Sequence, residues 1–320
     1  MKVFSIIITL IIFSSLAQAQ DWQFIEDEHF IIRYKKNLNS ALEIQNIAKD
    51  FYPNAVNQLG YSTGRKISIW FCETKDEFNR AVGAPIQDWA AGCAYPLQAR
   101  IVILDPKFTE NKRLNLSRIL RHEIVHVIFG LYVGEYMKNV PRWFIEGVAM
   151  YVSDDWGYLN YWTMLTGTLS NALRPLYEIS SDFPEKASSA QLAYSQSYSI
   201  TAFMVKRYGM DAFRECINLI SKGRPFDEAF AGATGANLDW FESRWTKDLK
   251  KHYRWFSLVS SWVVLWGIVI LIAFIAYMRR KIKNRRIIKQ WEMDEELWNY
   301  YEFVNDDTDE DNSETWTYRY

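Results

Sequence analysis

The sequence has 320 residues, 49% hydrophobic and 16% aromatic, so it can build a sizeable core in one large or two modest domains. The formal net charge at pH 7 is −1, and no basic stripe runs through the part expected to fold, so we expect no binding to nucleic acid. No segment recurs at a fixed period, which argues against a repeat architecture.

Residues 1–19 have the pattern of a secretory signal peptide. A charged start is followed by an apolar run over residues 3–13, and the small residues Ala17 and Ala19 precede the expected cleavage ahead of Gln20. The apolar run is too short to be a good membrane span. We therefore expect the chain that follows to be exported.

The first part of the exported chain is predicted to form a mixed sheet with a helix inserted in it. Apolar and β-prone runs, bounded by turn residues, predict the strands, and spacing at three and four residues predicts the helix. The expected strands cover residues 29–34, 66–72, 92–95 and 99–104, and the expected helix covers residues 39–59.

An H-E-x-x-H motif lies inside an apolar run, residues 121–130, that is predicted to be helical. Residues four apart lie on one face of a helix, so His122 and His126 can offer their imidazoles to one metal ion. Glu123 is placed to take a proton from metal-bound water. The alternative is a pair of polar residues facing solvent, and the apolar character of the rest of the helix argues against it.

A second helix, predicted from Pro141 onward, carries Glu146 within the run W-F-I-E-G-V-A-M-Y. A zinc site with two histidines requires a third protein ligand and keeps its fourth position for water. The apolar neighbours of Glu146 argue against a solvated surface glutamate. The sequence therefore predicts Zn²⁺ as the cofactor, held by His122, His126 and Glu146.

These two motifs together resemble the gluzincin zinc peptidases, and within them the chain is most similar to the bacterial peptidase MA-like family. The resemblance rests on residues 122–126 and 143–151, with a supporting Y-S-Q-S-Y-S run at 194–199, and extends over nearly all of residues 22–250. It implies an α+β, zincin-like (thermolysin-like) fold. Such a fold has an N-terminal mixed sheet, two metal-binding helices and a C-terminal helical subdomain.

The resemblance also implies the chemistry, which is hydrolysis of peptide bonds by a metal-activated water with Glu123 as the general base. Many gluzincins stabilise the oxyanion with a tyrosine or histidine from a downstream helix. Here Tyr194 or Tyr198 could do so, and the position in its helix favours Tyr198, with simple packing as the alternative for either. Several gluzincins also carry an acidic residue one turn after the glutamate ligand. This chain has Met150 there, so Asp154 or a backbone carbonyl would have to replace it.

In zincin folds the strand before the metal helix forms a sheet edge along the cleft, where an extended peptide can pair with it. Residues 99–104 occupy that place in this sequence, with an interior strand as the alternative. The expected substrate is a peptide or protein. Nothing in the sequence decides between endopeptidase and exopeptidase action.

The expected domain order is a catalytic core over residues 20–190, a helical subdomain of the same ectodomain over 191–254, and then a membrane segment. Residues 255–278 form an uncharged apolar run that is predicted to be a single transmembrane helix. The basic residues that begin at Arg279 predict that residues 279–320 stay in the cytoplasm. This tail is first basic and then acidic, and we expect it to be disordered. The ectodomain would lie outside the cytoplasm, facing the periplasm if the membrane is a bacterial inner membrane.

Some residues of the exported part carry weaker signals. Cys72, Cys93 and Cys216 are odd in number, so a fully paired framework is excluded, and a Cys72–Cys93 bridge or buried free thiols both remain open. His29 begins a strand far from the motif, and we expect it to be structural rather than a metal ligand.

The sequence thus predicts a membrane-anchored, extracytoplasmic zinc metallopeptidase. The alternative is a catalytically weak or inactive pseudo-peptidase that acts as a binding or adaptor module in the envelope. A purely structural envelope protein is a further alternative. Both explain poorly why His122, Glu123, His126 and Glu146 are all present. The sequence gives no indication of the oligomeric state.

Overall fold

The computed structural model describes residues 22–83, 91–109, 115–184, 186–259 and 262–309. Contacts divide the chain into two units, Met1–Lys251 and His252–Tyr320, and each is described by itself. The predicted signal peptide, residues 1–19, lies outside the described residues.

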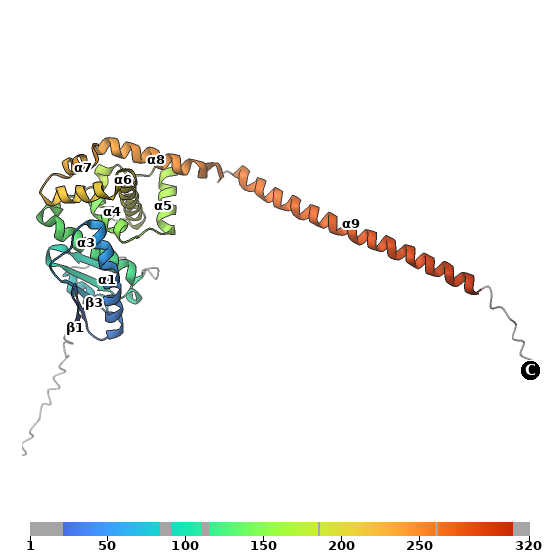
Figure 1. The fold of residues 1–320 in the computed structure, drawn as a ribbon, viewed down its shortest axis with the longest axis horizontal. Coiled ribbons are helices and arrows are strands. Elements are labelled where there is room, and N and C mark those ends of the chain that lie inside the picture. Colours follow the sequence, from blue (N-terminus) through green and yellow to red (C-terminus); the bar gives the residue numbers. More distant parts are fainter. Residues whose placement is uncertain (1–21, 84–90, 110–114, 185, 260–261, 310–320) are drawn as a thin grey trace, which may run out of the picture. The chain divides into compact units, whose positions relative to one another are not determined.

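The first unit begins with a five-stranded mixed sheet (Figure 1). Its strands are β1 (Gln23–Glu26), β2 (Phe30–Tyr34), β3 (Ile67–Cys72), β4 (Gly92–Tyr95) and β5 (Arg100–Leu104), in the spatial order β1-β2-β3-β5-β4. Strands β2, β3 and β5 are parallel, whereas β1 and β4 are antiparallel to their neighbours and form the two edges. The α+β class and the N-terminal mixed sheet are confirmed.

Strand β5 lies inside the sheet, so the expectation that residues 99–104 form its edge is wrong. The chain reverses between β4 and β5 through the 3-10 helix η1 (Pro96–Gln98), and Ala99 completes the reversal with a φ of 49°. Because β4 folds back onto β5 as a hairpin, it takes the outer hydrogen-bonding side of β5. The free edge next to β5 is therefore β4.

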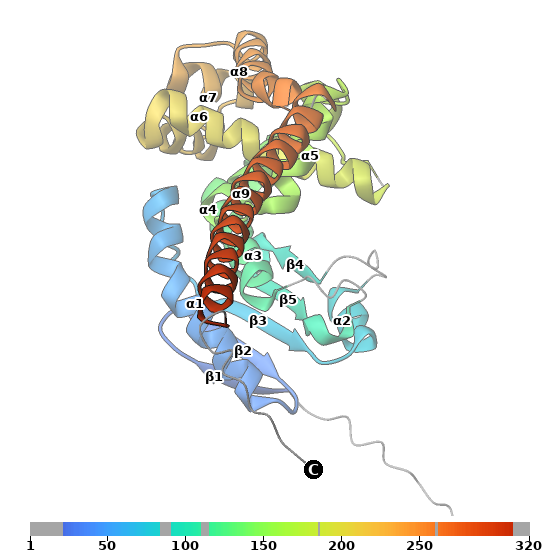
Figure 2. The same ribbon diagram turned by 90° about the vertical axis from the view of Figure 1, so that its right-hand side faces the viewer.

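One face of the sheet forms the core of this unit. Side chains at alternate positions of the three central strands are buried, as the period of two along a strand requires. The residues on this face, each at most 1% exposed, are Phe30, Ile32, Ile67, Ile69, Phe71, Ile101 and Ile103. Helices α1 (Leu38–Leu59) and α3 (Leu116–Val133), which pack against each other, cover this face (Figure 2). On the opposite face, Phe78 of α2 (Lys75–Val82) packs with Cys72, Val102 and Leu104.

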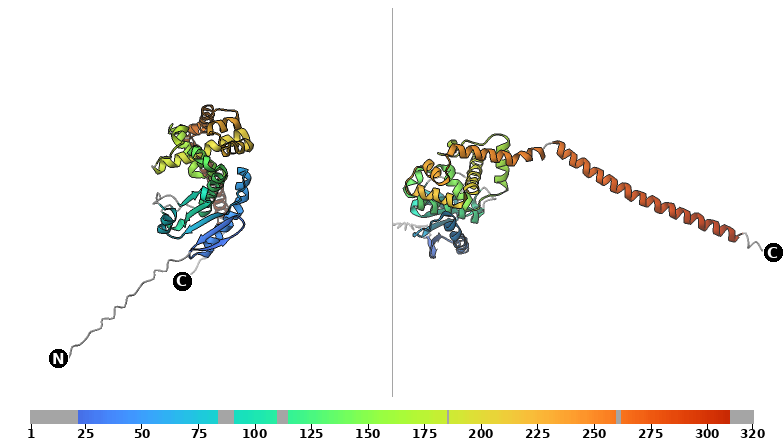
Figure 3. Two further views of the ribbon diagram at one scale, coloured as in Figure 1. Left: turned by 90° about the vertical axis from the view of Figure 1, so that its left-hand side faces the viewer. Right: turned by 45° about the horizontal axis from the view of Figure 1, so that its top comes forward.

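The rest of the first unit is helical and gathers beyond α3, away from β1 and β2 (Figure 3). Its helices are α4 (Arg142–Val152), α5 (Tyr158–Leu169), α6 (Ala187–Ser221), α7 (Phe226–Thr234) and the first part of α8 (Leu238–Val259), with short 3-10 turns η3 (Gly134–Asn139) and η4 (Leu176–Ile179). A further 3-10 turn, η2 (Pro106–Phe108), comes earlier, between β5 and α3. Helix α6 is broken at Gly209, where φ is 87°. Helix α4 packs along α6 and also contacts α3, so the two motif helices lie side by side.

The second unit contains the end of α8 and the helix α9 (Trp262–Asp309). Within the described part of the chain, no helix is long and apolar enough to cross a membrane, so the predicted transmembrane helix over residues 255–278 is not confirmed. That range is divided between α8 and α9, with residues 260–261 outside the described part. Helix α9 then continues to Asp309, where the sequence predicts a disordered tail. The Lys, Arg and Glu residues after Met278 are good helix formers, which accounts for this difference.

Candidate metal centre

Helix α3 carries His122, Glu123 and His126. Its N-terminus is capped by Asn115, whose side chain accepts hydrogen bonds from two backbone N–H groups of the first turn. The two histidine side chains lie one turn apart and are only 15% and 13% exposed. Their Nε2 atoms face each other at 3.0 Å. The helix thus presents both imidazoles to one point.

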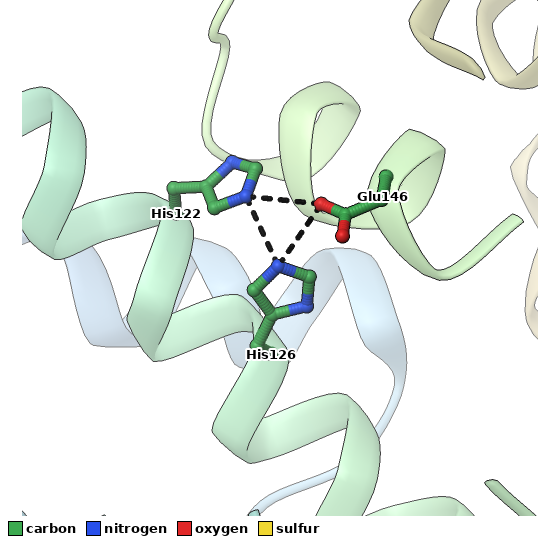
Figure 4. Close-up of side chains that lie close together, drawn as sticks. All are labelled: His122, His126 and Glu146. Carbon is green, nitrogen blue, oxygen red and sulfur yellow. Dashed lines mark hydrogen bonds and ion pairs between the residues drawn. The ribbon is translucent and has the colours of Figure 1, made fainter. Parts of the chain in front are cut away.

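Helix α4 brings Glu146 to the same point. Trp143 and Val148 on this helix are fully buried and fix it in the core. The Oε2 atom of Glu146 lies 3.5 Å from Nε2 of His122 and 3.4 Å from Nε2 of His126 (Figure 4). Three polar atoms from two helices therefore converge.

The spacing of these three atoms suits a tetrahedral zinc ion. Two ligands at about 2.1 Å from such an ion lie roughly 3.4 Å from each other. The observed separations are 3.0, 3.4 and 3.5 Å. Two imidazole nitrogens and one carboxylate oxygen are also a set that leaves a coordination position open in catalytic zinc sites. His122, His126 and Glu146 thus form a group that could hold a metal ion.

Two carboxyl groups of the centre, that of the buried Glu146 and that of the half-buried Glu123, are in different electrostatic environments. Burial raises the pKa of Glu146, but the positive charge of His126 and the hydrogen bonds with both histidines outweigh it and hold that pKa well below its usual range. For Glu123, burial raises the pKa to about 7, with the charge of His122 opposing the rise and that of Glu146 adding to it. Glu146 therefore has the character of an ionised ligand. Glu123 has that of a group exchanging protons near neutral pH.

The carboxyl group of Glu123 lies directly against strand β4. A Cβ atom added at Gly92 would be 2.7 Å from Oε1 of Glu123 and 2.8 Å from Cγ2 of Ile119. Contacts this short do not occur, so a side chain at position 92 would displace the carboxyl group. The edge strand β4 therefore contacts Glu123 with the backbone of Gly92, which has no side chain.

The two tyrosines considered for oxyanion stabilisation lie in different surroundings on α6. The ring of Tyr198 stacks on Trp156 at 4.5 Å, and burial together with the negative charges of Asp154 and Tyr151 raises its pKa. The pKa of Tyr194 is also raised, by burial first and then by the charges of Glu146 and Glu123. The charges of both site carboxylates thus contribute to the raised pKa of Tyr194, whereas the charges that act on Tyr198, the tyrosine favoured from the sequence, are those of Asp154 and Tyr151.

Two polar neighbours of the ligands were not predicted. Arg142 begins α4, and its Nε lies 3.7 Å from Oε1 of Glu146, the oxygen that is not paired with the histidines. Arg142 precedes Glu146 by four residues, and residues at this spacing on a helix are neighbours, so the sequence could have predicted this contact. Asp155 places Oδ2 at 3.9 Å from Nδ1 of His122. The expected substitute for Met150 was Asp154, which is exposed here. Helix α4 ends at Val152, and the reversal that follows has no clear sequence signal.

His29 and the cysteines lie outside the metal group. His29 stacks on Tyr52 with ring centroids 4.2 Å apart, in agreement with a structural role. Cys72, Cys93 and Cys216 are all free thiols, so the bridge left open by the sequence is not formed.

Comparison with known proteins gives the family of this chain. The family model of the Peptidase MA superfamily matches residues 51–251, which include both metal helices and α6. The chain therefore belongs to the Peptidase MA superfamily, and membership suggests a peptidase. It is also similar to the uncharacterized protein YhcO of Bacillus subtilis (strain 168), with 26% identity over 219 residues. That match covers 63% of this chain and 63% of YhcO.

Proposed function

We propose that this chain is a zinc-dependent metallopeptidase of the gluzincin type, with a zincin-like fold and with His122, His126 and Glu146 as the metal ligands. One observation carries the proposal, namely that the three ligand atoms lie 3.0 to 3.5 Å apart, as tetrahedral zinc ligands do. Membership of the Peptidase MA superfamily supports the hydrolase class.

Glu123 is the general base of the proposed reaction. Zinc, when bound, supplies Lewis-acid activation of a water molecule near neutral pH. Glu123 follows the first histidine ligand, and its pKa of about 7 suits proton exchange in that range. Its carboxylate accepts the proton of the attacking water and then delivers it to the leaving amine.

Tyr194 is the proposed donor to the oxyanion that forms on the substrate carbonyl. Burial raises its pKa first and the charges of Glu146 and Glu123 add to the rise, while Arg142 opposes it. A tyrosine phenol is protonated near neutral pH, and the raised pKa of Tyr194 keeps it so, so its O–H can donate a hydrogen bond. Loss of one such donor costs about 3 to 4 kcal/mol in enzymes where it has been removed. We thus assign the oxyanion donor to Tyr194 and not to Tyr198, which the sequence favoured.

A peptide substrate is proposed to add to the free edge of the sheet at β4. An edge strand has unpaired N–H and C=O groups, and an extended peptide can satisfy them. The backbone of Gly92 adjoins the Glu123 carboxyl group, so a peptide paired along β4 would pass close to the general base. This arrangement supports peptide bonds as the substrate class.

We further propose that the peptidase is exported and works attached to a membrane, with its C-terminus in the cytoplasm. The signal-peptide pattern of residues 1–19 supports export, and the basic residues after Met278 support the orientation. In the described part of α9, the large apolar side chains from Val264 to Met278 are 38 to 66% exposed. Contact with lipid would remove this apolar surface from water.

The proposal is tested by zinc content and by hydrolysis in the purified full-length chain. We expect about one zinc ion per chain in the parent, much less in Glu146→Ala, and full retention in Glu123→Gln. A peptide library analysed by mass spectrometry would be cleaved by the parent, and Glu123→Gln would be slower by roughly 10² to 10⁴. Zinc binding without cleavage would favour the adaptor alternative. If the parent chain stays metal-free when zinc is supplied, the proposal that it is a zinc-dependent peptidase is wrong.

A further inference from the structure

His122 has one ring nitrogen turned toward the other ligands and one turned away. Nε2 faces His126 and Glu146, whereas Nδ1 is buried and has no hydrogen-bond partner. The carboxylate of Asp155 lies 3.9 Å from that nitrogen. A separation above 3.5 Å is closed either by a bridging water or by a small movement of a side chain. A buried polar nitrogen therefore has a carboxylate within reach.

Asp155 is held in this position from several sides. Its side chain is 17% exposed, and its Oδ1 atom is ion-paired with Nε of Arg118, one turn before His122 on α3. Its backbone N–H donates to the carbonyl oxygen of Met150 at 2.8 Å. Its own carbonyl oxygen accepts from Nδ2 of Asn160, on α5, at 3.0 Å. The carboxylate is thus fixed relative to α3, α4 and α5 at once.

The backbone before Asp155 is also unusual. Asp154 has a φ of 55°, in the left-handed region that non-glycine residues seldom adopt. This reversal after the end of α4 turns the chain back, so Asp154 is exposed while Asp155 points toward α3. Met150, one turn after Glu146, is buried and offers no oxygen acceptor on its side chain.

From this arrangement we infer that Asp155 is a positioning residue that holds the His122 ring through Nδ1–H, with Arg118 holding Asp155 in turn. The inference rests on the proposed zinc site. A carboxylate on the distal nitrogen of a metal-ligating histidine fixes its tautomer and ring orientation and raises its basicity. The acceptor would come from the turn after α4, not from α4 itself. It would tie the ligand on α3 to the start of α5.

A merely structural role for the Arg118–Asp155 pair predicts different results. A structural tie between α3 and the turn would change thermal stability but not the proton on His122 or the affinity for zinc. Asp155→Asn is the informative variant, because it keeps the size of the side chain and removes its charge. Asp154→Asn is the matched control, since it makes the same change one residue earlier at an exposed position. Asp155→Glu retains a carboxylate and tests rescue.

The experiment measures two quantities in the full-length chain: zinc affinity by competition with a chromophoric chelator, and the proton on His122 Nδ1 by NMR. We expect Asp155→Asn to weaken zinc binding by about 10- to 100-fold, Asp154→Asn to leave it unchanged, and Asp155→Glu to recover part of the loss. In the parent, the Nδ1 proton of His122 should be downfield-shifted and slow to exchange. In Asp155→Asn it should move upfield.

Equal zinc affinity in Asp155→Asn and Asp154→Asn would overturn the inference, as would a parent with no protected proton on His122 Nδ1. The NMR measurement on the parent requires no variant, so it tests the inference even if Asp155→Asn does not fold. A parent that binds no zinc would instead overturn the proposed function. In that case the Nδ1 proton of the metal-free chain still reports whether Asp155 holds His122.

Discussion

At the scale of single residues, the centre separates two carboxyl groups by what surrounds them. Glu146 faces two imidazoles, which keep it ionised, whereas Glu123 is half-buried against the β4 backbone, and removal from water raises its pKa to about 7. Environments that push two carboxyl pKa values apart are how one site assigns different roles to the same side chain. Here the separation favours a ligand at 146 and a proton carrier at 123.

The two tyrosines on α6 give a direct residue-level prediction. Tyr194→Phe should lower kcat by about 10² to 10³ with zinc retained, because it removes the proposed oxyanion donor and leaves the ring in place. Tyr198→Phe is the matched control and should keep kcat near that of the parent, since its ring stacks on Trp156. Steady-state kinetics on a cleaved library peptide measures both. A larger loss in Tyr198→Phe would return the role to that residue.

Gly92 supports a second prediction at this scale. Gly92→Ala places a methyl group where Oε1 of Glu123 lies, at 2.7 Å, so the carboxyl group has to move. A misplacement of about 1 Å can cost about 100-fold in rate, and we expect a loss of that order in kcat with zinc content unchanged. Gly64→Ala is the control, because nothing lies within 4 Å of its added Cβ. Full activity in Gly92→Ala would show that Glu123 has room to reorient.

At the scale of elements, Glu146 depends on how closely α4 approaches α6. A Cβ atom at Gly147 would lie 2.5 Å from the backbone oxygen of Ser197 and 2.2 Å from Oγ1 of Thr201. Backbone cannot move aside as the end of a side chain does. The glycine after the ligand is therefore required for helix packing.

Gly147→Ala should destabilise the first unit by about 1 to 3 kcal/mol or more, the usual cost of overpacking. Gly232→Ala is a matched control in another helix, where the added Cβ meets only the flexible side chain of Leu219 at 3.2 Å. There the better helix propensity of alanine should leave stability unchanged or raised by up to about 1 kcal/mol. Thermal unfolding of the metal-free chains compares the two. Equal melting temperatures would mean that α4 and α6 can separate at no cost.

Elements also show where sequence reasoning succeeded and where it could not. Periodicity located β2, β3, β4, β5 and the helix with His122 and His126, because those patterns are local, whereas the short and mostly exposed edge strand β1 was not predicted. The order of β4 and β5 was missed, since it depends on which side of β5 the hairpin occupies. The same holds for Asp155, whose approach to His122 depends on a left-handed residue at 154. Contacts made by chain reversals leave little trace in a single sequence.

At the scale of the whole molecule, the apolar stretch of α9 bears on where the chain resides. Ile270, Leu271 and Ile272 are 57 to 66% exposed in succession, so this stretch is apolar all round. We expect a helix of this kind to be covered in its working state, as the proposed membrane attachment requires. The motif residues and the family match do not indicate this apolar stretch, because the match ends at residue 251, before α9 begins.

Replacing Ile270, Leu271 and Ile272 by Asp should release the chain from membranes, because each charge costs about 3 kcal/mol in hydrocarbon. The parent should stay in the membrane fraction after alkaline carbonate washing. A control that changes Ile282, Ile288 and Met293 to Asp alters exposed apolar residues of the same helix outside the apolar run, and should remain membrane-bound. A parent found wholly in the wash would contradict membrane attachment.

The three thiols of the first unit differ in a way that offers a practical handle. Cys72 and Cys216 are fully buried, and burial raises the pKa of each to about 12, so alkylating reagents react with them slowly. Burial also raises the pKa of Cys93, but this residue is half-buried on β4, next to Gly92, so reagents can reach its thiol more readily than the other two. A fluorophore coupled to Cys93 in the folded chain would sit on the strand where a peptide is expected to pair. The native sequence thus already contains a labelling position for following peptide binding by fluorescence, separately from any cleavage.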